Sequence, residues 1–388
     1  MRRRVALVVL MLAMAPSIAL IYSVVSRTPS PVLRTVAAAA YPGAVAFDPM
    51  SGRAVVAGNS GEVSLLDTRS GDVLRTLPGR TILGGANVAI DAGAGRAIVC
   101  DFAGRVRALD TRTAAPVWGL TVGRGLSDVA VDDRRGRAYV VNPASPVVRV
   151  LDTRSGRLQR TIALGQTPVE VATDPATGHV FVTWGGDKMS TLDGATGRVL
   201  YTATKILGLR LVVSAATGHV FVVDESRDMV GVFDARTGFS INRVRVGRGP
   251  IAVAVDDGAK RVFVANQLSK TVSVLDAISG AVRKTVSVEV EPIALTVDDR
   301  TDRVLVVGVD NPMNKLGTKN TIAQILYSFE YQRGLNGAVS VLDARDGHVV
   351  QTVRVGQFPN AVAVDERAGR ALVTNNDNVS LLDTRALR

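Results

Sequence analysis

Aspartate is the chemically active residue type that recurs most regularly in this chain. It follows a leucine or a phenylalanine at eight positions, 40 to 43 residues apart except for one interval of 67: Asp67, Asp110, Asp152, Asp193, Asp234, Asp276, Asp343 and Asp383. A carboxylate can act as a general acid or base, but catalysis does not need eight copies of it. Asp67 stands four positions before Gly71, and an Asp in such a turn accepts hydrogen bonds from the turn amides. We therefore interpret the aspartate series as structural.

Histidine and cysteine, the other residue types suited to metal, nucleophilic or redox chemistry, are scarce. His179 and His219 stand in ATGHVF and His348 stands in DGHVV, all in turns of a repeating segment. This placement favours neither a shared metal nor a Ser-His-Asp site. Cys100 is the one cysteine, so a disulfide within the chain and the CxxC and CxxCH motifs are absent. The sequence predicts no catalytic residue, no metal ligand and no cofactor.

The aspartate interval is the period of a repeat that must position any site. In the sixth copy, four short segments rich in β-branched residues are separated by Asp, Gly and Ser turns: IAVAVDD (251–257), VFVAN (262–266), TVSVLD (271–276) and AVRKTVSV (281–288). One such sheet cannot bury both of its faces, whereas eight sheets stacked around an axis can. We predict an all-β fold, an eight-bladed β-propeller of four-stranded antiparallel blades.

The two ends of the repeat region complete each other. The eighth copy stops at LLDTRALR, after its third strand, and VLRTVAAA at 32–39 matches the fourth strand of other copies. We predict that the strand at 32–39 completes the last blade, so that the ring has no open edge and the propeller domain spans 32–388.

Residues 1–26 have the pattern of an export signal. Arg2, Arg3 and Arg4 precede an uncharged apolar run at 5–25 that is long enough to span a bilayer. The segment is therefore either a cleaved signal peptide or a transmembrane anchor that attaches the protein to the membrane. In both cases we expect the rest of the chain outside the cytoplasm, in the periplasm or at the cell surface.

The repeat resembles a known family. The segments VFVAN and TVSVLD, preceded by P-x-x-VAVD, are similar to the YVTN-type β-propeller repeat found in exported, surface-layer and YncE-like periplasmic proteins. The resemblance covers about 32–388. It implies an exported propeller and, because the repeat motif is structural, it implies no particular activity. Eight repeats, where seven are common in that family, prevent transfer of any site residue by residue.

One segment interrupts the repeat. Between the second and third strands of the seventh copy, 311–337 forms an insertion in which Ile322, Ile325, Leu326 and Phe329 recur with helical spacing. We predict an amphipathic helix at about 319–332. Tyr327 and Tyr331 would form a second stripe on it. The helix would serve as a local cover for its blade, as a lid, or as a docking knob for a partner.

Candidate binding residues lie on the face that carries the second-to-third-strand loops and the blade-to-blade links. Their mixture of charged, amide and aromatic side chains suits a recognition surface, although solvated loops have the same composition. The candidates are Arg80, Asp101, Arg105, Arg124, Trp184, Asp187, Asp224, Arg248, Asn266, Tyr327, Tyr331, Asn375 and Phe358.

Three hypotheses on function remain open. The first is a non-catalytic, monomeric binding scaffold for a protein, an envelope polymer or a small ligand. The second is a propeller enzyme or redox-accessory subunit acting on a small molecule at the channel mouth. Against it stands the lack of clustered His or Cys, and it requires three convergent carboxylate or amide groups there. The third is binding of an anionic polymer or nucleic acid, which the net charge of +11 favours. No Lys/Arg run is longer than Arg2–Arg4, however.

Overall fold

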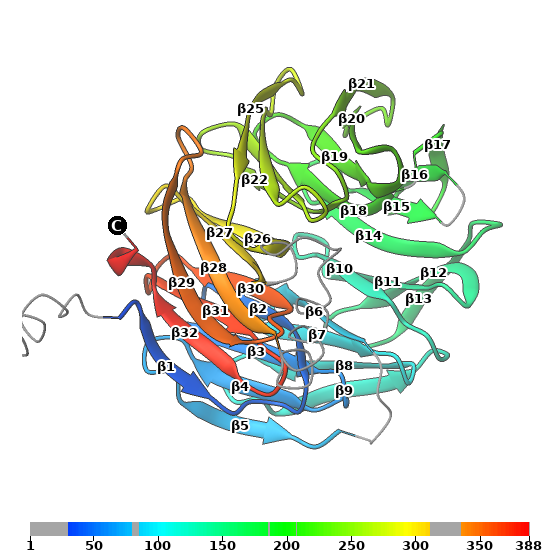
Figure 1. Cartoon of the computed structure of the whole chain (residues 1–388). Helices are drawn as coiled ribbons and strands as arrows, with labels where there is room; N and C mark the ends of the chain where they lie inside the picture. Colours follow the sequence, from blue (N-terminus) through cyan, green and yellow to red (C-terminus); the bar gives the residue numbers. More distant parts are fainter. Residues whose placement is uncertain (1–29, 80–84, 185–186, 207, 311–334, 388) are drawn as a thin grey trace, which may run out of the picture. The chain divides into compact units, whose positions relative to one another are not determined.

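The fold was analysed in a computed structural model, which describes residues 30–79, 85–184, 187–206, 208–310 and 335–387. Contacts divide the chain into two units, Met1–Pro31 and Val32–Arg388. Within the second unit, eight four-stranded antiparallel sheets are arranged around one axis (Figure 1). The predicted eight-bladed β-propeller is thereby confirmed.

Each of the first seven blades is formed by four consecutive strands. Blades 1 to 4 comprise β2 (Pro42–Asp48), β3 (Arg53–Gly58), β4 (Val63–Asp67) and β5 (Val73–Leu77); β6 (Ala86–Asp91), β7 (Arg96–Asp101), β8 (Arg105–Asp110) and β9 (Pro116–Thr121); β10 (Asp128–Asp132), β11 (Arg137–Asn142), β12 (Ser145–Asp152) and β13 (Leu158–Ala163); β14 (Pro168–Asp174), β15 (His179–Trp184), β16 (Lys188–Asp193) and β17 (Val199–Thr204). Blades 5 to 7 comprise β18 (Gly208–Ser214), β19 (His219–Asp224), β20 (Met229–Asp234) and β21 (Ser240–Arg245); β22 (Pro250–Asp256), β23 (Arg261–Asn266), β24 (Thr271–Asp276) and β25 (Val282–Ser287); β26 (Glu291–Asp298), β27 (Arg303–Val309), β28 (Asn336–Asp343) and β29 (Val349–Gln357).

Blade 8 joins the two ends of the propeller unit. It contains β30 (Ala361–Asp365), β31 (Arg370–Thr374) and β32 (Val379–Asp383), and its fourth strand is β1 (Val32–Val36). The strands β1 and β32 run antiparallel, with Val36 opposite Val379. The predicted closure is therefore confirmed. The strand ends at Val36 and not at residue 39, because Ala39 and Tyr41 have positive φ angles that a strand does not accommodate.

The first strand of every blade packs against the first strand of the next, from β2 through to β30 and back to β2. We call these eight strands the inner ring. The hydrophobic core lies between adjacent blades. Between blades 6 and 7, for example, Phe263 is fully buried together with Val274 and Val304. Stacking the blades thus removes from water the apolar faces that one sheet leaves exposed.

Hydrogen bonds of one kind link neighbouring blades at three of the four threonines that follow the repeated aspartate, namely Thr68, Thr111 and Thr153. Thr153 Oγ1 donates to Asp91 Oδ2 of the preceding blade (2.5 Å), and Thr68 Oγ1 donates to Asp365 Oδ2 (2.6 Å). Thr111 donates to Asp48 in the same way. The carboxylate acceptors are buried at the ends of the inner-ring strands. A buried carboxylate needs such a partner, so the pair fixes one blade to the next.

A second kind of link appears where Gly or Ala takes the place of that threonine. Here the first residue of a second strand donates to the backbone carbonyl of the replacing residue in the following blade. The pairs are Arg137 Nη1 with Gly194 O (2.8 Å), His179 Nδ1 with Ala235 O (2.9 Å), His219 Nδ1 with Ala277 O (2.9 Å) and Arg261 Nη1 with Ala344 O. Two of the three histidines are therefore structural links.

The interruption of blade 7 lies where the repeat predicts it, between β27 and β28. The helix predicted at about 319–332 falls on residues 311–334, which are outside the described residues, as is the predicted span at 5–25. Among the residues that are described, no helix is long and apolar enough to cross a membrane.

Candidate functional site

Equivalent positions near the start of the inner-ring strands differ in chemistry around the ring. Four are alanines on consecutive blades: Ala252, Ala294, Ala361 and Ala44. The other four, also on consecutive blades, are Asn87, Asp128, Glu170 and Arg210. We call these four residues the polar arc. It lies at the end of the inner ring that carries the second-to-third-strand loops, and we call that end the loop face.

Two neighbouring pairs within the polar arc are in contact, Asn87 with Asp128 and Glu170 with Arg210. Asn87 Nδ2 donates to Asp128 Oδ1 at 2.6 Å, and the Val171 amide donates to Asp128 Oδ2 at 2.9 Å. Arg210 Nη1 lies 4.0 Å from Glu170 Oε2. The side chain of Glu170 is 14% exposed and that of Arg210 is 58% exposed, while Asn87 and Asp128 are partly buried, so Arg210 is the member that faces solvent.

Burial sets the protonation of the two carboxyls. It raises the pKa of Asp128 to about 6, against the opposing effect of the Val171 amide hydrogen bond. Burial, and secondarily the charge of Asp128, raise the pKa of Glu170 well above its ordinary value, against the attraction of Arg210. The folded state therefore holds the proton of each carboxyl more tightly than an exposed carboxyl would. Glu170 Oε2 is buried without a hydrogen-bond partner among the described residues.

Some of the loop residues expected from the sequence are brought together. Arg227 forms ion pairs with Asp187 (2.5 Å) and with Asp224 (3.0 Å), and so connects blades 4 and 5. Asp101 accepts from its neighbour Arg105, with a contact of 2.8 Å. These ion pairs hold the loops in place. None of these ion pairs includes a residue of the polar arc.

Other predicted residues are buried. Trp184 is 6% exposed and has Lys188 above its ring, while Asn266 and Asn375 are fully buried. Asn266 Nδ2 donates to Ser273 Oγ at 3.0 Å, and Asn375 Nδ2 donates to Ser380 Oγ at the same distance. The two amides thus connect the second and third strands of their own blades and offer little surface to a ligand.

The remaining predicted residues are spread over the loop face. Arg124 and Arg248 are exposed in the links that follow β9 and β21, and Phe358 is partly buried after β29 with a φ of 45°. Arg80, Tyr327 and Tyr331 lie outside the described residues.

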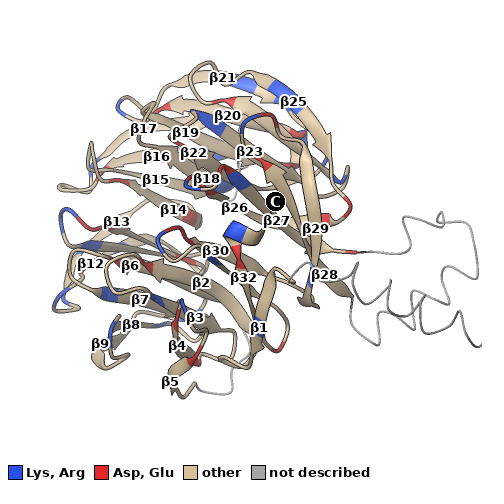
Figure 2. Ribbon diagram, turned by 90° about the vertical axis from the view of Figure 1, so that its left-hand side faces the viewer, with Lys and Arg blue, Asp and Glu red and all other residues tan. Residues whose placement is uncertain are grey.

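The charge of the described part is not gathered on one face. The eight outermost strands carry eight cations and no Asp or Glu: Arg34, Arg75, Arg160, Arg243, Arg245, Arg283, Lys284 and Arg354. They are distributed around the circumference, as Figure 2 shows for β21 and β25, while cations and anions alternate in the loops. This is the scattered distribution that weakens the anionic-polymer hypothesis. Among the described residues, no three His, Cys, Asp or Glu side chains are arranged to hold a metal ion.

Comparison with protein families identifies the chain. The model of the family described as outer membrane protein assembly factor BamB matches residues 102–352, well over half of the sequence. The chain belongs to this family. The match spans blades 3 to 6 entirely, together with the last two strands of blade 2 and most of blade 7.

Solved structures share the architecture of this BamB-family chain at low sequence identity. The C-terminal WD40 domain of Sif2 has a TM-score of 0.71 at 11% identity, covering 91% of this chain and 97% of that one. The computationally designed Ika8 protein has a TM-score of 0.68 at 14% identity, covering 91% and 98%. The dihydro-heme d1 dehydrogenase NirN, in complex with DHE, has a TM-score of 0.68 at 17% identity, covering 88% and 73%. At these identities the likeness shows the fold alone. No curated protein sequence matches significantly.

The polar arc of this BamB-family chain was missed by sequence analysis, although the repeat contains the signal. Aligned copies place alanine two residues after a proline, which lies at or next to the start of β2, β22 and β26 and just before β30. The same position holds Asn, Asp, Glu and Arg in four successive copies. The position lies inside a strand, whereas the sequence-based candidates were placed in the loops, where propeller ligands often bind.

Proposed function

We propose that this BamB-family chain is a non-catalytic binding module of the cell envelope that takes its ligand or partner at the loop face, over the polar arc. The observation that carries the proposal is the one-sided arc itself. Packing of the inner ring does not require Asn87, Asp128, Glu170 and Arg210, because alanine fills the same position in the other four blades.

The chemistry of the arc suits binding of a polar group. Arg210 is the exposed member and can donate in a bidentate manner. Behind it stand a buried carboxyl with one unpartnered oxygen, in Glu170, and the carboxyl of Asp128. A partner that brings a donor to Glu170 Oε2 and an acceptor to the exposed Arg210 would contact both side chains at once.

Two features support a location in the envelope. The family is described as an outer membrane assembly factor, and residues 1–26 have the pattern of an export signal. The YVTN-type resemblance of the repeat agrees with an exported propeller. We therefore propose an extracytoplasmic protein, secreted or attached to the membrane through its N-terminal segment.

Cross-linked capture from the host envelope tests the proposal. Wild type is compared with Arg210→Ala and with Arg75→Ala. The latter removes the same charge from an exposed position on the outermost strand of blade 1. We expect one set of captured species to be lost with Arg210→Ala and retained with Arg75→Ala. If both variants capture the wild-type set, the arc is not the binding surface.

A second candidate function is conversion of a small molecule at the arc. It is favoured by the equivalent positions of Asn87, Asp128 and Glu170 on neighbouring blades, which bring together the three amide and carboxyl groups that the hypothesis required, and by the raised pKa of the two carboxyls. Incubation of the protein with small-molecule extracts of the envelope tests it. A compound consumed by wild type and spared by Glu170→Gln supports the second candidate, and consumption by neither protein dismisses it.

A further inference from the structure

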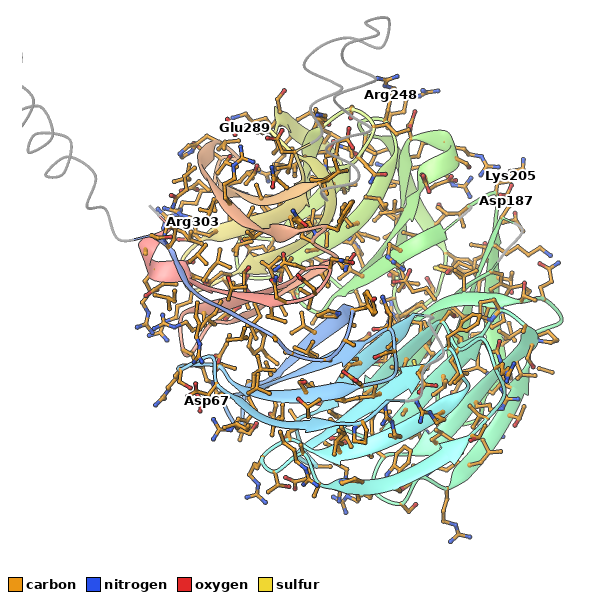
Figure 3. The ribbon with its side chains drawn as sticks, turned by 60° about the horizontal axis from the view of Figure 1, so that its bottom comes forward. Asp67, Asp187, Lys205, Arg248, Glu289 and Arg303 are labelled. Carbon is orange, nitrogen blue, oxygen red and sulfur yellow. The ribbon has the colours of Figure 1, made fainter. Side chains whose placement is uncertain are left out.

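A separate cavity of about 330 Å³ lies between blades 4 and 5, away from the polar arc. Lys205 and Ile206, in the link that follows β17, form one wall, and Asp224 and Arg227 with Met229, Gly231 and Arg243 form the other. Figure 3 shows Lys205 beside Asp187 at the edge of the propeller unit, in agreement with the hydrogen bond from the Ile206 amide to the Asp187 carbonyl (3.2 Å). The volume is at the lower end of the range for small-molecule sites.

Two of the cations around this cavity are not neutralised by a carboxylate. Arg243 donates to the carbonyl oxygens of Thr204 (2.7 Å) and Lys205 (3.0 Å), which hold the guanidinium in place but carry no charge. The Lys205 ammonium is exposed and has no ion-pair partner among the described residues. Arg227, in contrast, is already engaged by Asp187 and Asp224, which leaves those two carboxylates occupied.

The base of the cavity is apolar. Ile206 is 1% exposed, and Met229 is partly buried beside it. At Gly231, an added Cβ would lie 2.4 Å from Ile206 Cδ1, so the absence of a side chain there allows Ile206 to pack. The cavity therefore joins a hydrophobic surface to two free positive charges.

The corresponding position between blades 6 and 7 shows that the fold does not require these cations. The cavity there, of about 120 Å³, is lined by Glu289, Asp310 and Arg354. Its one cation is paired, since Arg354 lies 3.3 Å from Asp310. The same architecture thus accommodates an acidic lining in one place and a cationic lining in the other.

We propose that the cavity between blades 4 and 5 is a binding site for an amphipathic carboxylate. The carboxylate would pair with Arg243 and Lys205, and its apolar group would lie on Ile206 and Met229. Such a group is presented both by a free aliphatic acid and by the C-terminal residue of a peptide with an apolar side chain. This proposal does not depend on the polar arc.

Titration of the full-length protein with hexanoate, followed by NMR of the ligand, tests the charge requirement. Uncharged 1-hexanol serves as the matched ligand. Lys205→Asn removes the ammonium while keeping a residue that tolerates the φ of 62° at this position. Loss of one charge-assisted contact corresponds to weakening of about tenfold. Glu289→Ala, in the cavity between blades 6 and 7, is the control and should bind hexanoate as wild type does.

A leucine-terminated peptide, compared with its C-terminal amide, distinguishes the two sources. Binding of hexanoate alone assigns the site to free acids, and binding of the free peptide but not its amide assigns it to a polypeptide C-terminus. The proposal is overturned if neither ligand binds, if 1-hexanol binds as well as hexanoate, or if Lys205→Asn binds hexanoate as strongly as wild type. The variant Glu170→Gln should leave hexanoate binding unchanged, which separates this site from the arc.

Discussion

His179 Nδ1 lies 2.9 Å from the carbonyl oxygen of Ala235 in the next blade. A carbonyl can only accept, so Nδ1 carries the proton in this contact. His219 repeats the arrangement one blade further, with Ala277. Histidine, a residue type that suggests metal or catalytic chemistry, thus links neighbouring blades. It does so where alanine replaces the threonine that forms the other kind of link.

The threonine–aspartate hydrogen bonds that link neighbouring blades should contribute measurably to stability. We expect Thr153→Val to lower the free energy of unfolding by about 1–3 kcal/mol, because the buried carboxylate of Asp91 loses its partner. Denaturant midpoints of wild type and variant measure the effect. The chain offers a matched control in Thr384, whose buried hydroxyl has no hydrogen-bond partner among the described residues. An equal loss in Thr384→Val would show that the hydrogen bond is not the cause.

The raised pKa of Glu170 predicts a dependence of stability on pH. Its pKa is raised in the folded protein, so the folded state binds the proton more tightly than the unfolded state does. The contribution of this group to stability is therefore present below the unfolded pKa and falls as pH rises toward the folded pKa. The fall is about 1.4 kcal/mol for each unit of separation between the two values.

Glu170→Gln removes this titration. Its melting temperature should equal that of wild type below the unfolded pKa of the carboxyl and should exceed it as pH rises from there toward the folded pKa. The carboxyl of Asp299, whose pKa is raised to about 6 by burial and by the nearby Asp256 and Glu366, gives both proteins the same background slope. A constant difference between wild type and variant across the range would contradict the assignment.

Cys100 should be inert in the folded protein. It is 1% exposed, and burial raises the pKa of its thiol, so both access and thiolate formation are suppressed. Ellman's reagent should detect no thiol in buffer and one per chain in denaturant. Rapid labelling under native conditions would show that the inner strands of blade 2 open readily.

The closing strand should be essential to the ring. Removal of 1–37 takes away β1 and leaves the edge of β32 unpaired, so we expect a lower denaturant midpoint and concentration-dependent association. Size-exclusion chromatography and denaturation measure both effects. Removal of 1–29 alone is the control. A synthetic peptide containing Val32–Val36 should restore the midpoint if strand pairing is the cause.

The fold could be predicted because its determinants are periodic. Asp67 and its seven equivalents mark the turns, and VFVAN and TVSVLD alternate as strands do, so the same local rule applied eight times. The candidate site could not be predicted in this way. Asp128 and Glu170 are distant in sequence from Arg210 and meet only because three blades stand side by side.

The loop candidates show the opposite limit. Asn266 ends β23 and Asn375 directly follows β31, in segments whose sequence predicts polar loops. In the structure both side chains are buried and donate to the hydroxyl groups of Ser273 and Ser380. Lys205 and Arg243 were not noticed, because neither stands out until the blades place them around one cavity. A short stretch of sequence does not show which of its side chains a neighbouring blade will cover.

The pairing of Val36 with Val379 has a consequence for the time course of folding. The two residues are 343 positions apart, whereas every other strand pair joins consecutive strands of the chain. Bringing such distant segments together costs about 3 kcal/mol more conformational entropy than closing a hairpin of about a dozen residues. Seven blades consist of strands that are consecutive in the chain, whereas the eighth needs both ends of the propeller unit. We therefore expect the pairing of β1 with β32 to form last in folding. We also expect unfolding of the propeller unit to become cooperative only once this pairing is present.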